Sequence, residues 1–139
     1  MILRNVVLRL LEQAGGPVPK TKLVKLLYLV DRELVTRGRR PLFRWRLWLY
    51  GPFSREVLDI LDWLEARRDV EKNVKVEGLK VTVWYKAVGK PGQLPPHVEE
   101  AVSAVAAKWA TAPLDSILQH VYSLPEVREA ELGEEIKWR

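Results

Sequence analysis

The spacing of the apolar side chains changes along the chain, and this change limits the possible folds more than any other feature. Residues 2–14 and 21–37 repeat apolar side chains every three to four positions, which predicts two helices. Residues 43–50 alternate apolar and polar side chains, which predicts a strand that Gly51-Pro52 should end. The chain therefore begins with two helices and a strand.

The helical spacing returns over residues 54–68, where Ser54 is a suitable N-cap. A hairpin should follow, with strands over 70–76 and 79–88 and a turn near Glu77-Gly78. A third helix followed by a hairpin completes the order of a winged-helix-like core over residues 1–90. We predict a mainly α fold with a small antiparallel β-sheet, in the α+β class.

Residues 95–131 have the pattern of further helices, which should cover the open side of the sheet or form a homodimer. Ser123-Leu124-Pro125-Glu126 has the spacing of a capping box for the last short helix. Residues 132–139 form an acidic tail, which we expect to be loose.

The length of 139 residues suits one domain, and we expect residues 1–139 to form a single one. The sequence has no cysteine, which excludes disulfides and thiolate metal sites. No apolar run approaches the roughly 18 residues of a membrane helix, and the first residues lack the pattern of a signal peptide. We therefore expect a cytoplasmic protein without a membrane partner. The many Arg, Glu and Pro residues are typical of a heat-adapted source.

No set of side chains in the sequence is typical of an active site. His97 and His120 fall in different predicted elements, without carboxylates at metal-ligand spacing, so we expect no metal and no cofactor. Asp31 is interpreted as a carboxylate on a helix surface. Glu135-Ile136-Lys137, with Asp115 upstream, resembles a nuclease pattern, but that pattern needs a strand and here falls in the tail. We predict that the chain is not an enzyme.

One face of the second predicted helix carries residues that suit a partner. On a helical wheel, Lys25, Tyr28, Leu29 and Arg32 gather opposite the core positions. Tyr and Arg are among the residue types most enriched at binding hot spots. We interpret these four residues as a partner-binding face. The alternative is that the C-terminal helices cover them.

Positive charge is concentrated in the first half of the chain. Residues 1–68 hold 14 Lys and Arg against 7 Asp and Glu, whereas residues 69–139 hold 9 against 11. Such a basic half suits nucleic acid, an acidic protein, or only a solvated surface. The arginines of residues 37–46 could bind phosphate, although we favour their covering nearby tryptophans. The positions that could contact nucleic acid or an acidic partner are Lys20, Lys22, Arg37, Arg39, Arg40, Arg44, Arg46, Lys72, Lys75 and Lys80.

The third predicted helix separates the two kinds of partner. In a DNA-binding winged helix, this element enters the major groove, so its outer face should be basic or rich in amides. Here the outer face includes Asp59, Asp62 and Glu65, which would repel phosphates. This helix therefore favours a protein partner over DNA.

Four segments in this order, LVKLLY at 23–28, PLF at 41–43, WLYGP at 48–52 and VYSLPEV at 121–127, resemble the Panacea domain, a family of SocA-like antitoxins and antitoxin-associated domains. The resemblance implies a non-enzymatic role and a toxin-like partner protein. It also implies that the signature positions are Lys25, Tyr28, Tyr50, Gly51 and Pro52. Leu47 and Phe53 depart from the family's pattern, which leaves a stand-alone regulator open.

We therefore expect an interaction protein that resembles an antitoxin and neutralises a partner protein by binding it. The alternative is a winged-helix DNA-binding transcriptional regulator, which the basic first half and the lysines of the hairpin favour.

Overall fold

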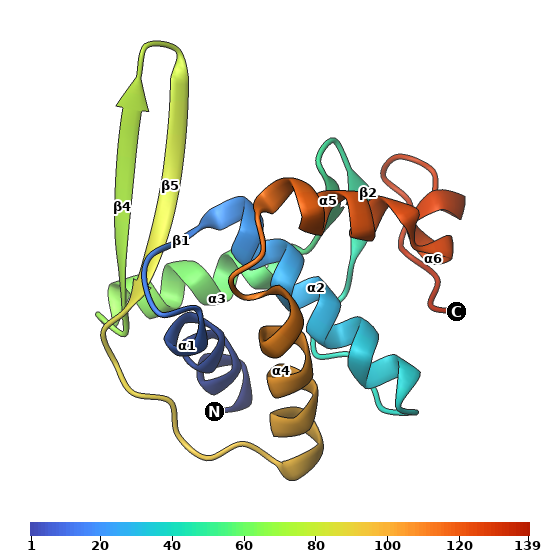
Figure 1. Ribbon diagram of the computed structural model, residues 1–139, viewed down its shortest axis with the longest axis horizontal. Coiled ribbons are helices and arrows are strands. Elements are labelled where there is room, and N and C mark those ends of the chain that lie inside the picture. The colour runs from blue at the N-terminus through green and yellow to red at the C-terminus, as the bar shows by residue number, and fades with distance from the viewer.

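Six helices and two small sheets make up the computed structural model, which describes residues 1–139 (Figure 1). In chain order they are α1 (Ile2–Ala14), β1 (Val18–Pro19), α2 (Lys20–Thr36), β2 (Arg46–Trp48), β3 (Gly51–Phe53), α3 (Arg55–Ala66), β4 (Val70–Glu77), β5 (Lys80–Ala87), α4 (Pro96–Trp109), α5 (Leu114–Ser123) and α6 (Pro125–Glu129). The mainly α, α+β class predicted from the sequence is confirmed.

The first sheet joins strands that are far apart in the chain. Its order is β1-β5-β4, and Val18 of β1 pairs with Tyr85 of β5. α1, α2, α3 and the β4–β5 hairpin occur in the order predicted for residues 1–90, and the β2–β3 hairpin occupies the place of the predicted strand. β1 itself was not predicted, because a two-residue strand that ends in proline has no alternating pattern to detect.

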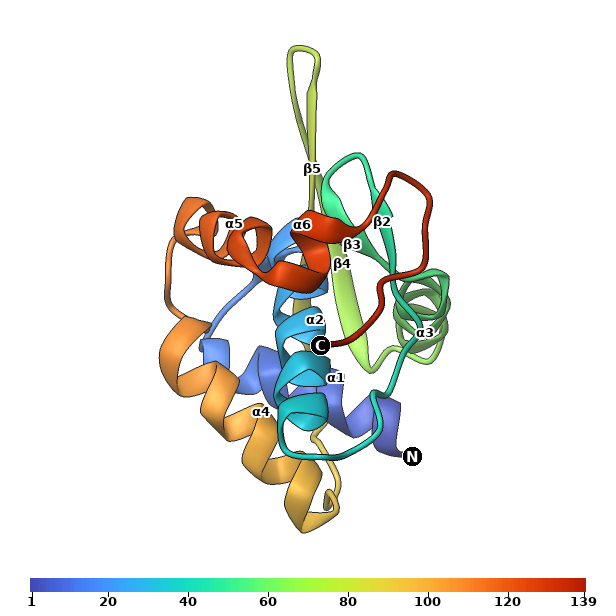
Figure 2. The ribbon, with the colours of Figure 1, turned by 90° about the vertical axis from the view of Figure 1, so that its right-hand side faces the viewer.

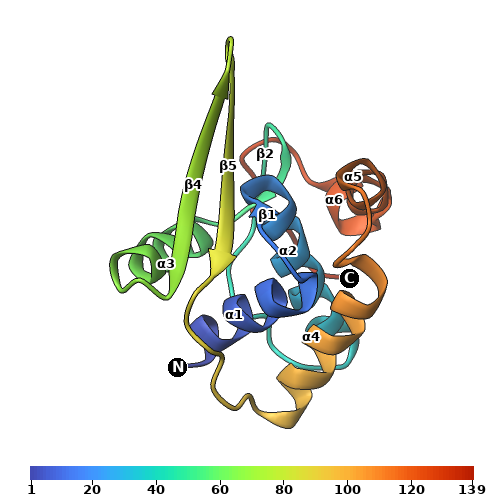
Figure 3. The ribbon, with the colours of Figure 1, turned by 60° about the vertical axis from the view of Figure 1, so that its left-hand side comes forward.

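The β4–β5 hairpin, called the wing below, extends well beyond the helices (Figures 1 and 3). Its strands pair along their full length, from Val70 opposite Ala87 to Glu77 opposite Lys80. Gly78 has a φ of 62°, which suits the first position of a two-residue hairpin turn. Only the base of the wing is buried, through Val70 and Tyr85.

The apolar stripes of the helices meet in one core. α4 packs against α1 and α2, and α5 packs against α2. The prediction that the C-terminal helices cover the sheet is wrong, because α5 and α6 lie across α2 instead (Figure 2). They do so because α2 is apolar on most of its circumference, so one neighbouring helix cannot bury it.

The predicted strand over residues 43–50 is shorter in the structure. β2 covers Arg46–Trp48, and Gly51-Pro52 opens the returning strand β3 instead of ending the structure. Gly51 has a φ of 97°, which a residue with a side chain rarely adopts, and Pro52 is tolerated because this sheet has only two strands. Glycine and proline here form part of a tight hairpin.

The expectation of a loose acidic tail is also wrong. The backbone N–H of Leu47 donates to Glu134 O, and that of Ile136 donates to Trp45 O, so the tail runs beside β2. Ile136 is buried, and the ring of Trp138 stacks on Tyr28 with centroids 5.2 Å apart. The acidic residues of the tail face solvent, whereas Ile136 and Trp138 pack in or against the core.

None of the helices is both long and apolar enough to cross a lipid bilayer.

Candidate functional site

The face of α2 that was predicted to bind a partner is covered by the protein itself. Lys25, Tyr28 and Leu29 are all buried, and only Arg32 retains partial exposure. The sequence interpretation of these four residues as an open face is therefore wrong, and the alternative, burial under the C-terminal segments, is what the structure shows. The physical reason is that α5, α6 and Trp138 pack on this side of α2.

Lys25 is the most unusual residue of this face. Its ammonium group is buried without a carboxylate partner, and Nζ donates one hydrogen bond to Pro52 O at 3.0 Å. Burial lowers its pKa to about 8, because the charged form loses hydration. A side chain at Gly51 would come within 3.2 Å of Lys25 Cε and 3.3 Å of Tyr122 Oη. Lys25, Gly51 and Pro52 therefore form one tightly packed junction.

Glu126 closes the same face from α6. Arg32 Nε donates to Glu126 Oε2 at 3.0 Å, and Tyr28 Oη donates to the same oxygen at 3.4 Å. The predicted capping box is wrong, because Ser123 Oγ donates to His120 O and Glu126 points to α2 instead of back along its own helix. Burial, then the charge of Glu126, raises the pKa of Tyr28 well above its usual value.

Asp31 was interpreted as a surface carboxylate and is in fact fully buried. It accepts hydrogen bonds from Leu42 N at 2.7 Å, Phe43 N at 2.9 Å and Trp45 Nε1 at 2.8 Å. Burial raises its pKa to about 6, which the three hydrogen bonds partly oppose. Asp31 thus ties the segment between α2 and β2 to the core.

The arginine-rich segment is partly used inside the protein. Arg37 pairs with Glu33 and Glu100, Arg44 pairs with Glu135, and Arg46 donates to Gly133 O. Arg39 and Arg40 are exposed. The favoured interpretation, in which these arginines cover their own tryptophans, is not what these contacts show. Instead, Arg44 and Arg46 bond to residues of the C-terminal tail. The partner of Arg44 is Glu135, which belongs to the Glu135-Ile136-Lys137 pattern that resembles a nuclease.

More than half of the large exposed apolar side chains belong to two hairpins, which project to the same side of the molecule (Figures 1 and 3). The β2–β3 turn exposes Trp48, Leu49 and Tyr50, the last to 75%. The wing exposes Val74, Val76, Leu79 and Val81, and Leu79 at its tip is completely exposed. We call this surface, together with Lys20 and Thr21 at the start of α2, the hairpin face.

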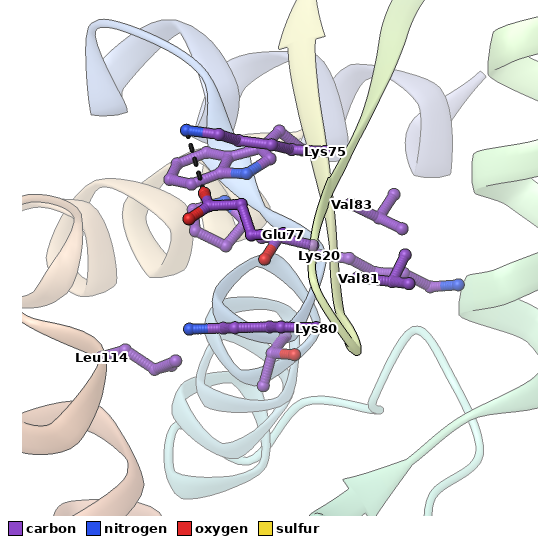
Figure 4. Close-up of a pocket in the computed structure, with 11 residues that line it drawn as sticks. Lys20, Lys75, Glu77, Lys80, Val81, Val83 and Leu114 are labelled. Atoms are coloured by element: carbon purple, nitrogen blue, oxygen red, sulfur yellow. Dashed lines mark ion pairs between the residues drawn. The ribbon is translucent and has the colours of Figure 1, made fainter.

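A cleft of about 590 Å³ lies in the hairpin face, beside the wing (Figure 4). Its walls are the wing, the start of α2 at Lys20 and Thr21, and Leu114 at the start of α5. Lys75, Glu77 and Lys80 point to one side of the wing, whereas Val81 and Val83 point to the other (Figure 4). Three lysines and one glutamate line the cleft, and the glutamate pairs with Lys75 at 3.1 Å.

A second cavity, of about 200 Å³, lies on the other side of the start of α2. It is lined by Lys20, Thr21, Lys25 and the exposed rings of Trp48 and Tyr50, and no acidic residue lines it. Because Lys20 and Thr21 line both hollows, the start of α2 separates the cleft beside the wing from the cavity beside β3. The predicted contact residues Lys20, Lys75 and Lys80 all line the cleft, whereas Arg37, Arg39 and Arg40 follow the opposite end of α2.

The predicted acidic face of α3 is exposed in the structure. Asp59, Asp62 and Glu65 face solvent, and Arg55 forms an ion pair with Asp59. The charges of Asp62 and Glu65 also reach Tyr85, whose pKa rises to about 12 mainly through burial. α3 therefore presents negative charge beside the base of the wing.

Comparison with models of protein families, with curated proteins and with solved structures finds no match for this chain. The resemblance to the Panacea domain stays a prediction from the sequence. Of its signature positions, Lys25, Gly51 and Pro52 are buried at the junction of α2 and β3, and Tyr50 is exposed beside it. Tyr28 is buried against Trp45 and Trp138.

Trp48, Leu49 and the valines of the wing belong to the hairpin face, but they were not predicted from the sequence as contact residues. For the valines, the sequence gives no signal that separates an exposed strand from a buried one. Val74, Val76 and Val81 lie at alternate positions on one face, which would normally indicate a face turned to the core.

Proposed function

We propose that this protein is a non-enzymatic binding protein that holds a partner protein on its hairpin face, as the resemblance to antitoxins suggests. The observation that carries the proposal is the position of the exposed apolar side chains. More than half of the large ones belong to the two projecting hairpins. Single exposed apolar residues are ordinary, but a cluster rimmed by polar groups is typical of a binding surface.

The shape of the wing supports this proposal. An isolated two-stranded hairpin is only marginally stable in water, and the outer half of the wing has no covering element. A partner that covers Val76 and Val81 would remove apolar area from water and stabilise the wing together with the complex. The aromatic rings of Trp48 and Tyr50 are of the kind that anchor protein interfaces.

The charge of the hairpin face favours an acidic partner. Lys20, Lys75 and Lys80 line the cleft, and Glu77 is the single carboxylate residue among its lining. Opposite charge on the partner would speed association and orient it on the face. An antitoxin acting here would neutralise its target by occupying an acidic and partly apolar surface.

DNA binding is the second candidate function, because Lys72, Lys75 and Lys80 lie on a wing. The acidic α3 opposes it, since the element that should enter the major groove presents Asp59, Asp62 and Glu65. We expect any DNA binding to be weak, insensitive to sequence and steeply reduced by salt. A footprint on one defined operator near physiological salt would favour the regulator instead.

The test begins with isolation of the protein from cells that naturally produce it. Mass spectrometry should identify a protein that co-purifies in fixed ratio, and absorbance at 260 nm should report no nucleic acid. The binary complex is then rebuilt from purified components and its Kd is measured by calorimetry. Trp48→Ala and Tyr50→Ala should each weaken binding by about 2 kcal/mol, the scale of a hot spot.

Trp63→Ala is the matched control, because Trp63 is an exposed tryptophan on α3, outside the hairpin face. It should leave the Kd unchanged. Equal losses from all three substitutions, or a complex that forms only with nucleic acid, would reject the hairpin face as the partner site.

A further inference from the structure

We propose that the outer edge of β5 accepts an extended segment of the partner protein as an added strand, and that this segment alternates apolar and acidic side chains. The inference rests on the proposed function and specifies what the hairpin face recognises. It is carried by three features of the structure: an open strand edge, a walled cleft along it, and two chemically different faces of the wing.

The edge of β5 is open along its outer half. β1 pairs only with Trp84 and Tyr85, so no strand lies beside Lys80–Val83 on that side. The backbone N–H of Val88 donates to Asp69 O, which makes the pair Asp69–Val88 a hydrogen-bonded one. Hydrogen-bonded and non-hydrogen-bonded pairs alternate along an antiparallel ladder, so the pair Val76–Val81 is a non-hydrogen-bonded one. The backbone N–H and C=O of Val81 therefore point away from β4, toward the open side.

The surroundings distinguish this edge from the other edge of the wing. The open edge of β5 lines the cleft of about 590 Å³, between the wing and the starts of α2 and α5. β4 contributes only Lys75 and Glu77 to the lining of this cleft, whereas β5 contributes five consecutive residues, Lys80–Trp84. A segment added to β5 would therefore gain side-chain contacts as well as backbone hydrogen bonds, as strand addition requires for specificity.

The two faces of the wing define the sequence of the segment. Val76 lies opposite Val81 and Val74 opposite Val83, so one face is apolar. Lys75 lies opposite Thr82 and Glu77 opposite Lys80, so the other face is polar and mainly basic. Because successive side chains of a strand point to opposite faces, an added strand would place alternate residues beside the valines and beside the lysines. Apolar and acidic residues in alternation match both faces.

The first experiment uses two synthetic peptides with blocked ends, one alternating Val and Glu and the other alternating Val and Lys. Binding to the full chain is followed by NMR of the amide groups. The Val/Glu peptide should shift the amides of Val81 and Val83 and should bind ~tenfold or more tightly than the Val/Lys peptide. The peptide can be methylated on the backbone nitrogens of its valines or on those of its glutamates. Only one of these two sets faces β5 in an added strand, so methylation of that set should abolish binding and methylation of the other should not.

The second experiment compares Val81→Pro with Val76→Pro. Each removes one outward backbone N–H, the first at the edge of β5 and the second at the edge of β4, and neither N–H belongs to the ladder between the strands. Val81→Pro should weaken the Val/Glu peptide ~tenfold or more, whereas Val76→Pro, which alters the apolar face but leaves the edge of β5 intact, should weaken it much less. If Val81→Pro does not fold, the methylated peptides give the same answer with the unaltered chain.

The outcomes separate this inference from the proposed function. A much larger loss from Val81→Pro than from Val76→Pro supports the added strand. Equal effects of the two prolines, binding of single-stranded DNA instead of peptide at the same amides, or no peptide binding would overturn it. If the rebuilt protein complex survives Val81→Pro unchanged but is weakened by Trp48→Ala, the partner binds the hairpin face without an added strand. If no protein complex can be rebuilt, the proposed function itself fails.

Discussion

The α2 face and the wing contain comparable mixtures of lysine, aromatic and aliphatic side chains, but only the α2 face is covered by the rest of the chain. On α2, Lys25 donates to Pro52 O, and Tyr28 lies between the rings of Trp45 and Trp138. On the wing, Val76 and Val81 face solvent. A mixture of cations and aromatics therefore does not identify a binding surface unless its coverage is also known.

The largest effect that tests this comparison should come from Tyr28→Ala. Removing a ring that packs edge-on to Trp45 and stacks on Trp138 should leave a cavity and lower the free energy of unfolding by about 5 kcal/mol. Chemical denaturation measures it. Tyr122→Ala is the control, because that tyrosine is 44% exposed, and it should cost much less. A loss below about 1 kcal/mol at Tyr28 would restore the idea of an open α2 face.

Asp31→Ala should be the next most destabilising change. It leaves the donors of Leu42, Phe43 and Trp45 without their acceptor inside the protein, which should cost about 4 kcal/mol. Asp59→Ala offers a matched control, since that aspartate is exposed on α3. Similar midpoints of denaturation for the two variants would contradict the buried role of Asp31.

Lys25 should make stability depend on pH in the alkaline range. Its pKa is about 8 in the folded protein and 10.5 as the ordinary value, so the folded state binds the proton less tightly than the unfolded state. The free energy of unfolding should therefore rise as the pH increases from 8 to 10.5, by about 3 kcal/mol from this residue. The difference between the parent and Lys25→Met isolates it, because Lys22 remains in both. If the free energy of unfolding changes with pH in the same way for the parent and for Lys25→Met, Lys25 is hydrated in the folded protein.

The smallest effect should come from the wing. Val76→Lys should change the free energy of unfolding by less than about 0.5 kcal/mol, because Val76 is exposed at the outer end of its strand. The same substitution at Val30, which is fully buried in α2, should prevent folding. If Val76→Lys were strongly destabilising, the wing would be covered in the free protein, for instance by a second copy of the chain.

The sequence predicted those parts of the fold that depend on neighbouring residues. The helical repeats, the Ser54 cap on α3 and the glycine of the wing turn act within a few positions, and all three agree with the structure. The capping box predicted at residues 123–126 is a local prediction that failed, but most of the other errors involve partners far apart in the chain. Asp31 bonds to residues 11 to 14 positions later, and Arg32 bonds to Glu126 across 94 positions.

The candidate site was predictable only in part. The lysines Lys20, Lys75 and Lys80 were predicted as contact residues, because charge can be read from composition. Their arrangement around a cleft depends on where β1 ends and where α5 begins, and both are results of tertiary packing. The exposed valines could not be recognised, since the alternation of an unburied strand is identical to that of a buried one.

The three hydrogen bonds to Asp31 also divide the connection between α2 and β2 into two parts that should differ in their tolerance to added sequence. Residues 38–41 form an arc that is closed at both ends, by the last turn of α2 and by Leu42. Since doubling the length of a flexible arc costs only about 0.6 kcal/mol in closure entropy, a short peptide tag inserted after Arg39 should be accepted. One extra residue between Leu42 and Trp45 would shift the donors out of reach of the carboxylate. The arc is thus a natural place to attach a dye or an affinity handle, on the side of the protein away from the two hairpins.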